Sequence, residues 1–248
     1  MKKILMIHGW LHSADRYMDI KQDLEKTMDC KVDLYEFPGF GDTKPTCYFN
    51  LLQHYSLLVR DVIEKNEYDY VIGHSMGGNI LLRVLDKIDT EAELILLSPA
   101  YRGISYLKPL TCFCPIMPLG LWLLQKIDCK LTTFLMKIVA LLTVNKWQKI
   151  DDRMIKDTRR ANAFIATVSM FELVWDSWRI TGDLWKKREV NLILGEKDRI
   201  ILNKKMRLLK EDLCSCKVHQ IAGIGHTAVL EAYDELVAKI GVIIGEEK

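Results

Sequence analysis

The residues with the clearest chemical potential in this chain are the six in Gly73-His74-Ser75-Met76-Gly77-Gly78. They lie between an apolar run, Tyr68 to Ile72, and a helix-like run that follows, so they predict a strand, a sharp turn and a helix. The small residues leave room for strand and helix to pack closely while the serine backbone is strained. A Gly-x-Ser-x-Gly pattern also occurs by chance in loops. The flanking elements nevertheless favour Ser75 as a nucleophile.

A nucleophilic serine needs a base, an acid that orients the base, and donors for the developing oxyanion. We predict that His226, which follows the last apolar strand-like run, is the base. Asp198, in the loop after the preceding strand, is the preferred acid, and Glu196 is the alternative. Functional groups gather beyond the carboxyl ends of parallel strands, and Ser75, Asp198 and His226 each follow a predicted strand. The chain order Ser, Asp, His supports the same assignment.

The oxyanion donors are expected to be backbone amides. One is the N–H of Met76, directly after the nucleophile, and the other is that of Trp10, in the loop after the first strand. We expect structural roles for the remaining histidines, which lie in turns, helix-like runs or a strand: His8, His12, His54, His74 and His219.

Short aliphatic or β-branched runs predict six strands, and near-continuous apolarity suits parallel strands buried on both faces. Segments with helical periodicity separate most of them, which is typical of a doubly wound α/β fold. The expected strands are 3–7, 31–35, 68–72, 94–97, 190–194 and 217–221, and the expected helices are 14–28, 49–66, 78–88, 203–213 and 228–244.

The interval between the fourth and fifth strands is long and contains several helix-like stretches. We therefore expect residues 1–100 and 189–248 to form the core and 101–188 to form a helical cap. The stretch 107–124 combines high apolar content with three prolines. We expect it to pack into the groove between cap and core; the functional alternative is that its inner side lines an apolar acyl-binding pocket, and both can be true. The residues expected to line that pocket are Phe113, Met117, Trp122, Phe134 and Trp175.

A basic stripe lies further along the same interval, on the helix predicted around 151–160. Its members are Arg153, Lys156, Arg159 and Arg160. Such a stripe is usually a solvated face, and the alternative is a contact with a phosphate-bearing carrier.

These pieces together resemble the α/β-hydrolase fold serine hydrolases of the esterase and lipase type, over nearly the whole chain. The matching segments are Ile7 to Trp10, Glu36 to Asp42, Gly73 to Gly78, Leu194 to Asp198, and Gly225-His226. The resemblance implies a cap after the fourth strand, with substrate between cap and core. The chain begins at what would be the family's third strand, so two leading strands are expected to be absent. Glu36 replaces the usual aspartate, and Leu11 stands where many relatives have glycine.

The amino-acid composition and net charge exclude some classes of binding partner. The chain has 248 residues, 49% hydrophobic and 27% charged, with a net charge of +2, so it has no nucleic-acid footprint. Seven cysteines are expected to be reduced thiols in the cytoplasm. The longest apolar segment, 131–144, is too short to span a bilayer and contains Lys137. We expect a small-molecule acyl ester as partner, no transmembrane segment, no cofactor and no metal; a homodimer stays open.

The predicted function is hydrolysis of an ester or thioester of an apolar acyl group through an acyl-enzyme on Ser75. Serine at the turn argues against the aspartate-nucleophile chemistry that the same scaffold supports elsewhere. Two alternatives stay open. One is acyl transfer or carbon–carbon bond hydrolysis on the same triad, and the other is a ligand-binding protein without turnover.

Overall fold

The computed structural model describes residues 1–127, 130–140, 144–145 and 150–245. Its centre is one sheet of six strands, in the order β2-β1-β3-β4-β5-β6, and every neighbouring pair is parallel. The predicted six-strand parallel sheet is confirmed. The strands are β1 (Lys2–Ile7), β2 (Cys30–Tyr35), β3 (Tyr70–His74), β4 (Glu93–Leu97), β5 (Glu189–Gly195) and β6 (Ser215–Ile221).

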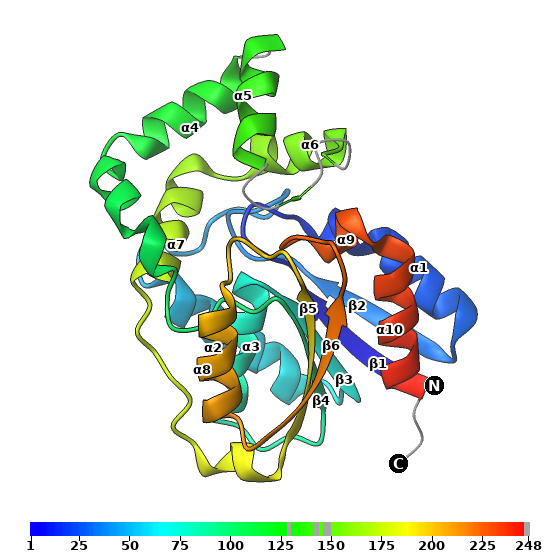
Figure 1. Cartoon of the computed structure of the whole chain (residues 1–248). Coiled ribbons are helices and arrows are strands. Elements are labelled where there is room, and N and C mark those ends of the chain that lie inside the picture. Colours follow the sequence, from blue (N-terminus) through cyan, green and yellow to red (C-terminus); the bar gives the residue numbers. More distant parts are fainter. Residues whose placement is uncertain (128–129, 141–143, 146–149, 246–248) are drawn as a thin grey trace.

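Helices cover both faces of the sheet (Figure 1), which explains why the central strands are almost continuously apolar. Alternate residues of β1 point to opposite faces. Leu5 and Ile7 join one buried cluster, with α2 (Leu51–Lys65), α3 (Met76–Leu85) and α8 (Asn203–Asp212). Ile4 and Met6 join the other, with α1 (Met18–Thr27) and α10 (Tyr233–Gly245).

Two helix predictions need correction. The run 14–28 is a 3-10 turn, η1 (Ala14–Tyr17), followed by α1. The run 228–244 is interrupted at Ala232, whose backbone leaves the helical region, so it forms α9 (Ala228–Glu231) and α10. Helix α3 also begins at Met76, two residues earlier than expected, since Ser75 itself is its N-cap.

Strand register brings the carboxyl ends of the strands together. Ile7 pairs with Gly73, His74 with Leu97, and Gly195 with Ile221. The loops that follow β1, β3, β5 and β6 therefore begin at the same edge of the sheet. This edge carries the candidate site.

The helices that follow β4, up to α7, lie beyond that edge, at the top of Figure 1, and the chain then runs along the side of the core to the start of β5. We divide the segment between β4 and β5 into two parts. The apolar half, residues 105–140, contains η2 (Ser105–Phe113), α4 (Met117–Lys126) and α5 (Lys130–Ala140). The anchored half, residues 150–188, contains α6 (Asp152–Arg160), α7 (Ala163–Trp175) and η4 (Asp183–Lys187). Part of the predicted apolar segment 131–144 lies outside the described residues.

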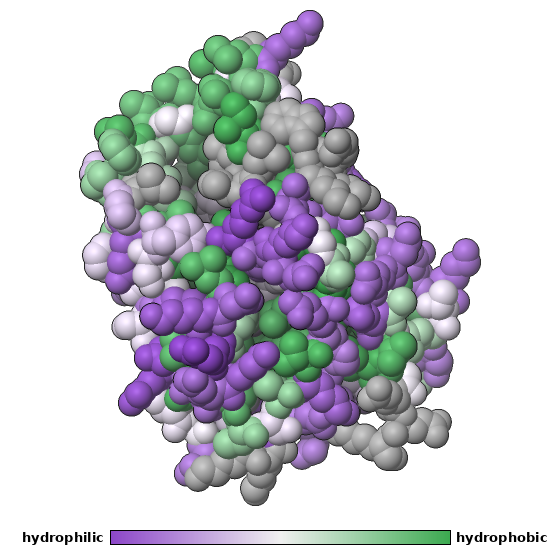
Figure 2. All heavy atoms as spheres, in the orientation of Figure 1, coloured by the Kyte–Doolittle hydropathy of each residue, from purple (hydrophilic) through white to green (hydrophobic). Residues whose placement is uncertain are grey.

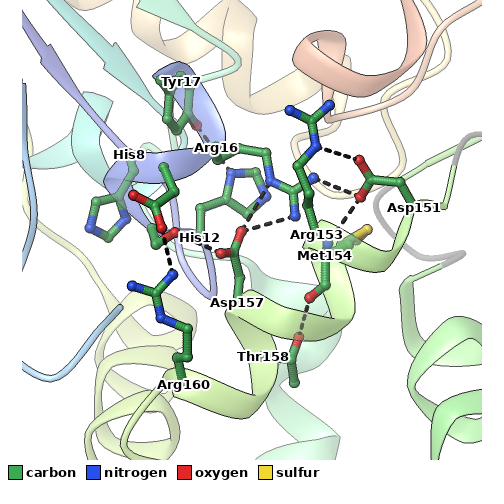
Figure 3. Close-up of polar contacts among 12 residues, drawn as sticks. His8, His12, Arg16, Tyr17, Asp151, Arg153, Met154, Asp157, Thr158 and Arg160 are labelled. Carbon is green, nitrogen blue, oxygen red and sulfur yellow. Dashed lines mark hydrogen bonds and ion pairs between the residues drawn. The ribbon is translucent and has the colours of Figure 1, made fainter. Parts of the chain in front are cut away.

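Buried polar contacts attach the anchored half to the core. The Arg16 guanidinium donates from Nε and Nη2 to Asp157, at 3.0 and 2.9 Å, and from Nη1 to Asp151 at 2.9 Å (Figure 3). Asp157 also accepts a 2.6 Å hydrogen bond from the Ser13 hydroxyl. The Arg16 and Asp157 side chains are only 1% and 4% exposed. These contacts fix α6 against the loop after β1.

The predicted basic stripe on α6 is therefore not an open surface along its whole length. Arg153 pairs with Asp19 at 2.5 Å and with Asp151, while Arg160 pairs with Asp15 at 2.6 Å and with Asp42. Two of the four basic side chains are already neutralised by carboxylates. A phosphate-bearing carrier is correspondingly disfavoured as their partner.

Helix α7 makes a second set of contacts with the core. The carboxylate of Glu172 accepts from the backbone N–H groups of Leu51 and Leu52, both at 2.9 Å, and so caps α2. Asp176, just after α7, pairs with Arg83 at 2.6 Å and accepts from the Asn79 amide at 2.8 Å. The end of α7 is thereby fixed to α3, the helix that begins next to Ser75.

Among the described residues, no single helix is both long and apolar enough to cross a membrane. The pair η2 and α4, which meet at 81°, passes the length and composition test only when the two are taken together.

Candidate active site

Ser75 occupies the tight turn between β3 and α3. Its φ of +49° and ψ of −109° form a strained conformation for a residue with a side chain. Close packing surrounds the turn: a Cβ added to Gly73 would lie 2.8 Å from the Gly77 carbonyl carbon, and one added to Gly77 would lie 2.7 Å from the His8 carbonyl oxygen. Only glycine permits this approach. The turn expected from the sequence is present.

The structure brings Ser75, His226 and Asp198 together. His226 Nε2 lies 2.9 Å from Ser75 Oγ, and His226 Nδ1 lies 2.8 Å from Asp198 Oδ2. The other carboxylate oxygen of Asp198 accepts from the N–H groups of Ile200 and Ile201, both at 2.8 Å. With Nδ1–H donating to Asp198, Nε2 is left to accept the serine proton.

Asp198 is held in its ionised form. Burial opposes ionisation, but attraction to His226, the hydrogen bond from His226 and the two backbone donors outweigh it and lower the pKa of Asp198 below its ordinary value. The alternative acid, Glu196, instead accepts from the Gly223 N–H at 2.8 Å. The geometry thus favours Asp198 over Glu196.

The loop after β1 lies directly against Ser75. A Cβ on Gly9 would lie 2.6 Å from His74 Nδ1 and 3.3 Å from Ser75 Cβ, so Trp10 begins close to the serine. His8 braces the loop, since its Nδ1 lies 2.8 Å from the Gly9 carbonyl and its Nε2 accepts from the Phe37 N–H at 3.0 Å. The Trp10 indole donates to the Ala166 carbonyl of α7 at 2.8 Å.

Met76 is the first residue of α3, and the first hydrogen bond of that helix runs from the Asn79 N–H to the Ser75 carbonyl. The amides of a helix's first turn have no partner within the helix. The Met76 N–H is therefore suited to bind an anion, and the positive end of the helix dipole adds to this.

Sequence reasoning missed a buried chain of polar side chains next to His226. The His74 ring is 2.9 Å from the Tyr17 hydroxyl through Nδ1 and 3.2 Å from the His226 carbonyl through Nε2. His12 Nδ1 lies 3.1 Å from the same hydroxyl, and its ring stacks on His74 at 5.2 Å. His74, adjacent to Ser75, thus helps to hold the backbone of His226. Its position in the Gly-His-Ser motif was the only sequence signal.

Burial keeps these rings neutral. Loss of hydration lowers the pKa of His74 to about 3, with proximity to His226 a smaller contribution, and lowers the pKa of His8 to about 4. The pKa of His12 is also well below its ordinary value, again mainly through burial.

Two glutamates hold the backbone of the loops around the site. Buried Glu231 accepts from the Gly225 N–H at 2.8 Å, beside His226, and from the Asn145 N–H at 2.7 Å. Glu36, the departure from the usual aspartate, accepts from the Ala14 N–H at 2.8 Å and from the Asp42 N–H at 3.2 Å. The longer side chain therefore links the loops after β1 and β2.

The five residues expected to line the pocket are spread over η2, α4, α5 and α7. Phe113, Trp122, Phe134 and Trp175 are 48–55% exposed. The expectation that the stretch 107–124 packs into a groove is wrong for several of its side chains, since Ile116 and Leu119 are 64% and 60% exposed. The sequence shows which residues are apolar but not which face of a short helix the core covers.

A parallel sheet with a strained serine turn, covered on both faces by helices, defines the α/β-hydrolase fold. The model of the alpha/beta hydrolase family matches residues 4–239, and the chain belongs to this family. No curated protein matches the sequence.

Several solved structures share the fold. An esterase from Exiguobacterium antarcticum superposes with a TM-score of 0.75 at 16% identity, covering 99% of this chain and 92% of that one. A hydrolase from Oleispira antarctica gives 0.77 at 13% identity, covering 100% and 92%. The 2-hydroxy-6-oxo-6-phenylhexa-2,4-dienoate hydrolase of Rhodococcus sp. strain RHA1 gives 0.71 at 17% identity, covering 99% and 91%. At these identities the similarity concerns the fold.

Proposed function

We propose that this hydrolase cleaves a carboxylic ester or thioester, with Ser75 as nucleophile, His226 as general base and acid, and Asp198 as the residue that orients His226. One observation carries the proposal: the continuous chain of hydrogen bonds from Ser75 Oγ through His226 to Asp198, at 2.9 and 2.8 Å. Nucleophile, base and orienting acid in this relation are the requirement for acyl transfer to serine.

In the proposed reaction, Ser75 Oγ attacks the substrate carbonyl while its proton passes to His226 Nε2. The carbonyl electrons move onto oxygen, where the N–H groups of Met76 and Trp10 stabilise the negative charge. As the intermediate collapses, His226 returns the proton to the departing alcohol or thiol, leaving an acyl-serine. Water then attacks the acyl-serine while His226 Nε2 accepts a proton from it. As this second intermediate collapses, His226 returns the proton to Ser75 Oγ, and the carboxylic acid is released.

We further propose that residues 101–188 act as a cap and that the acyl group is apolar. Support comes from the position of these helices beyond the strand ends and from their apolar side chains. Of the five side chains expected to line the pocket, we assign Met117 and Trp175 to contact with the acyl group and place Phe113, Trp122 and Phe134, which are 48–55% exposed, on the outer surface of the cap. The substrate is then a small acyl ester, met in the cytoplasm. Acyl transfer to another acceptor, or carbon–carbon bond cleavage, would use the same triad.

The proposal is tested with short p-nitrophenyl esters and a fluorophosphonate probe. Ser75→Ala should abolish labelling and reduce turnover by about 10⁴-fold or more. The matched control is Ser56→Ala, because both serines are 7% exposed and Ser56 only hydrogen-bonds to the Leu52 carbonyl within α2. The control should keep both properties.

Near-normal turnover by folded Ser75→Ala would exclude Ser75 as the nucleophile. A folded wild-type protein that neither reacts with the probe nor hydrolyses any ester would instead support a ligand-binding protein. A protein that reacts with the probe but turns over the ester only when an alcohol acceptor is added would be an acyltransferase.

A further inference from the structure

Helices α4 and α5 present apolar stripes to solvent. In α5, the large exposed residues Leu131 and Phe134 are three apart, and Leu135 and Ile138 continue the same helical face. In α4 the exposed stripe contains Leu119 and Leu123, four apart. A helix on a globular surface ordinarily turns such a stripe toward the core. In α4 and α5 these apolar stripes face solvent instead.

Helix α4 is the extreme case. It contains six large apolar side chains in ten residues, yet none of its residues is buried. Near its end, the Gln125 amide donates to the carbonyls of Thr158 and Ala161, both at 2.8 Å. Figure 2 shows hydrophobic side chains gathered over α4 and α5 at the upper left of the molecule. A continuous apolar surface of this kind marks a docking site.

We call this surface the apolar face and define it by Phe113, Ile116, Leu119, Trp122, Leu131 and Phe134, which are 48–64% exposed. Basic residues predominate in the segment that carries it. Residues 105–140 contain Lys108, Lys126, Lys130 and Lys137, but only one acidic residue. Lys126 is three residues after Leu123, and Lys130 is four residues before Phe134, so on helical spacing both flank the stripes.

We propose that the apolar face docks on the surface of a membrane containing anionic lipids. At 1.5 Å per residue, α4 and α5 are only about 15 Å long, half of a hydrocarbon core of about 30 Å. They can therefore lie in the interface without spanning it. Trp122 is suited to the boundary between headgroups and acyl chains, and lysine side chains extend toward anionic headgroups.

A second copy of the chain fits the apolar face less well. In a self-paired face the lysines of one copy would meet those of the other, with a single aspartate per copy among residues 105–140 to offset them. Repulsion between like charges would oppose that association. An anionic lipid surface instead attracts the same lysines.

The inference stands apart from the proposed hydrolysis and is tested without it. The full chain, as wild type and as Ser75→Ala so that no lipid is consumed, is floated with vesicles of phosphatidylcholine alone or mixed with phosphatidylglycerol. Both forms should bind the mixed vesicles more strongly, and salt should weaken this preference by screening. The double variant Leu119→Glu/Leu131→Glu should lose at least about tenfold in binding.

Val242→Glu is the matched control, because Val242 is an apolar residue of α10 with the same 60% exposure as Leu119. It should bind vesicles like wild type, and circular dichroism should show that all variants are folded. Failure of wild type to float, or flotation unaffected by the double variant, would overturn the proposal. So would a dimer in vesicle-free solution that the double variant dissociates and that binds no vesicles, since a second copy would then cover the face.

Discussion

The two halves of the segment between β4 and β5 differ in the kind of side chain that they bury and the kind that they expose. Where the anchored half meets the core, Asp157 and its core partner Arg16 are 4% and 1% exposed and each makes several hydrogen bonds. In the apolar half, Leu119 and Leu131 are 60% and 63% exposed. Charged groups are thus buried where the segment contacts the core, and apolar groups are exposed where it contacts solvent.

This difference indicates that neighbouring helices of the segment have different roles. Buried ion pairs demand precise geometry, since each charge has lost its hydration and must be compensated by its partner. Such contacts fix α6 and α7 to the core. An exposed apolar surface, by contrast, adds little to folding and acquires stabilisation only when something covers it. The anchored half therefore serves the site, and the apolar half is available for docking.

Acid should produce the largest effect, and it acts on the core beneath the anchored half. The fold holds His8, His12 and His74 neutral, whereas the unfolded chain protonates them with an ordinary pKa of 6.5. Between pH about 6.5 and about 4 the unfolded state binds more protons, so stability falls as the pH falls. Each ring contributes about 1.4 kcal/mol per pH unit.

Urea unfolding at a series of pH values measures this dependence. His12 also faces Arg16 and His226, so replacing it by asparagine should make the dependence shallower. His54→Gln, a change in a residue of α2 that contacts Thr46, should leave the slope unchanged. Equal stability across this range would show that the buried rings do not stay neutral.

Removing one partner of the buried ion pair should have the next largest effect. Asp157→Asn leaves Arg16 buried with less compensation, and we expect a loss of about 3–5 kcal/mol in the free energy of unfolding. Asp61→Asn, which breaks an exposed pair with Lys65, should cost less than about 1 kcal/mol. Similar costs in urea titrations of the two variants would remove the distinction between an anchored half and an ordinary surface.

The second attachment of the anchored half is the pair of hydrogen bonds by which the Glu172 carboxylate caps the N-terminus of α2, and it can be tested by removing that carboxylate. Glu172→Ala leaves the amides of Leu51 and Leu52 without their side-chain acceptor, so we expect a loss of about 1–2 kcal/mol. Glu64→Ala, near the other end of α2, removes only an exposed pair with Arg60 and should cost less. The same urea titration compares them, and equal losses would argue against a capping role.

The sequence predicted the sheet and the placement of Ser75, Asp198 and His226 because both depend on local patterns. Apolar runs define the strands, and short loops at strand ends bring the three residues together. The Arg16–Asp157 pair and the Tyr17–His74 contact join residues far apart in the chain, so no periodicity reveals them. Helix α9 ends at Glu231, whose carboxylate turns back to Gly225, and such tertiary contacts override helical propensity.

The smallest expected effect on stability is that of a substitution in the apolar half. It is the most direct test of the difference between the two halves. Leu131→Gln replaces a side chain that is already 63% exposed, so we expect a change in the free energy of unfolding within about 0.5 kcal/mol. Ile165→Ala, in the anchored half, removes a fully buried side chain that packs on Gly39 and should cost about 2–4 kcal/mol. If Leu131→Gln were equally costly in vesicle-free solution, its side chain would already be covered there, and the apolar half would be a second anchored element. A small cost in solution, together with weaker vesicle binding, means that the energy of these leucines is realised only when the face is docked.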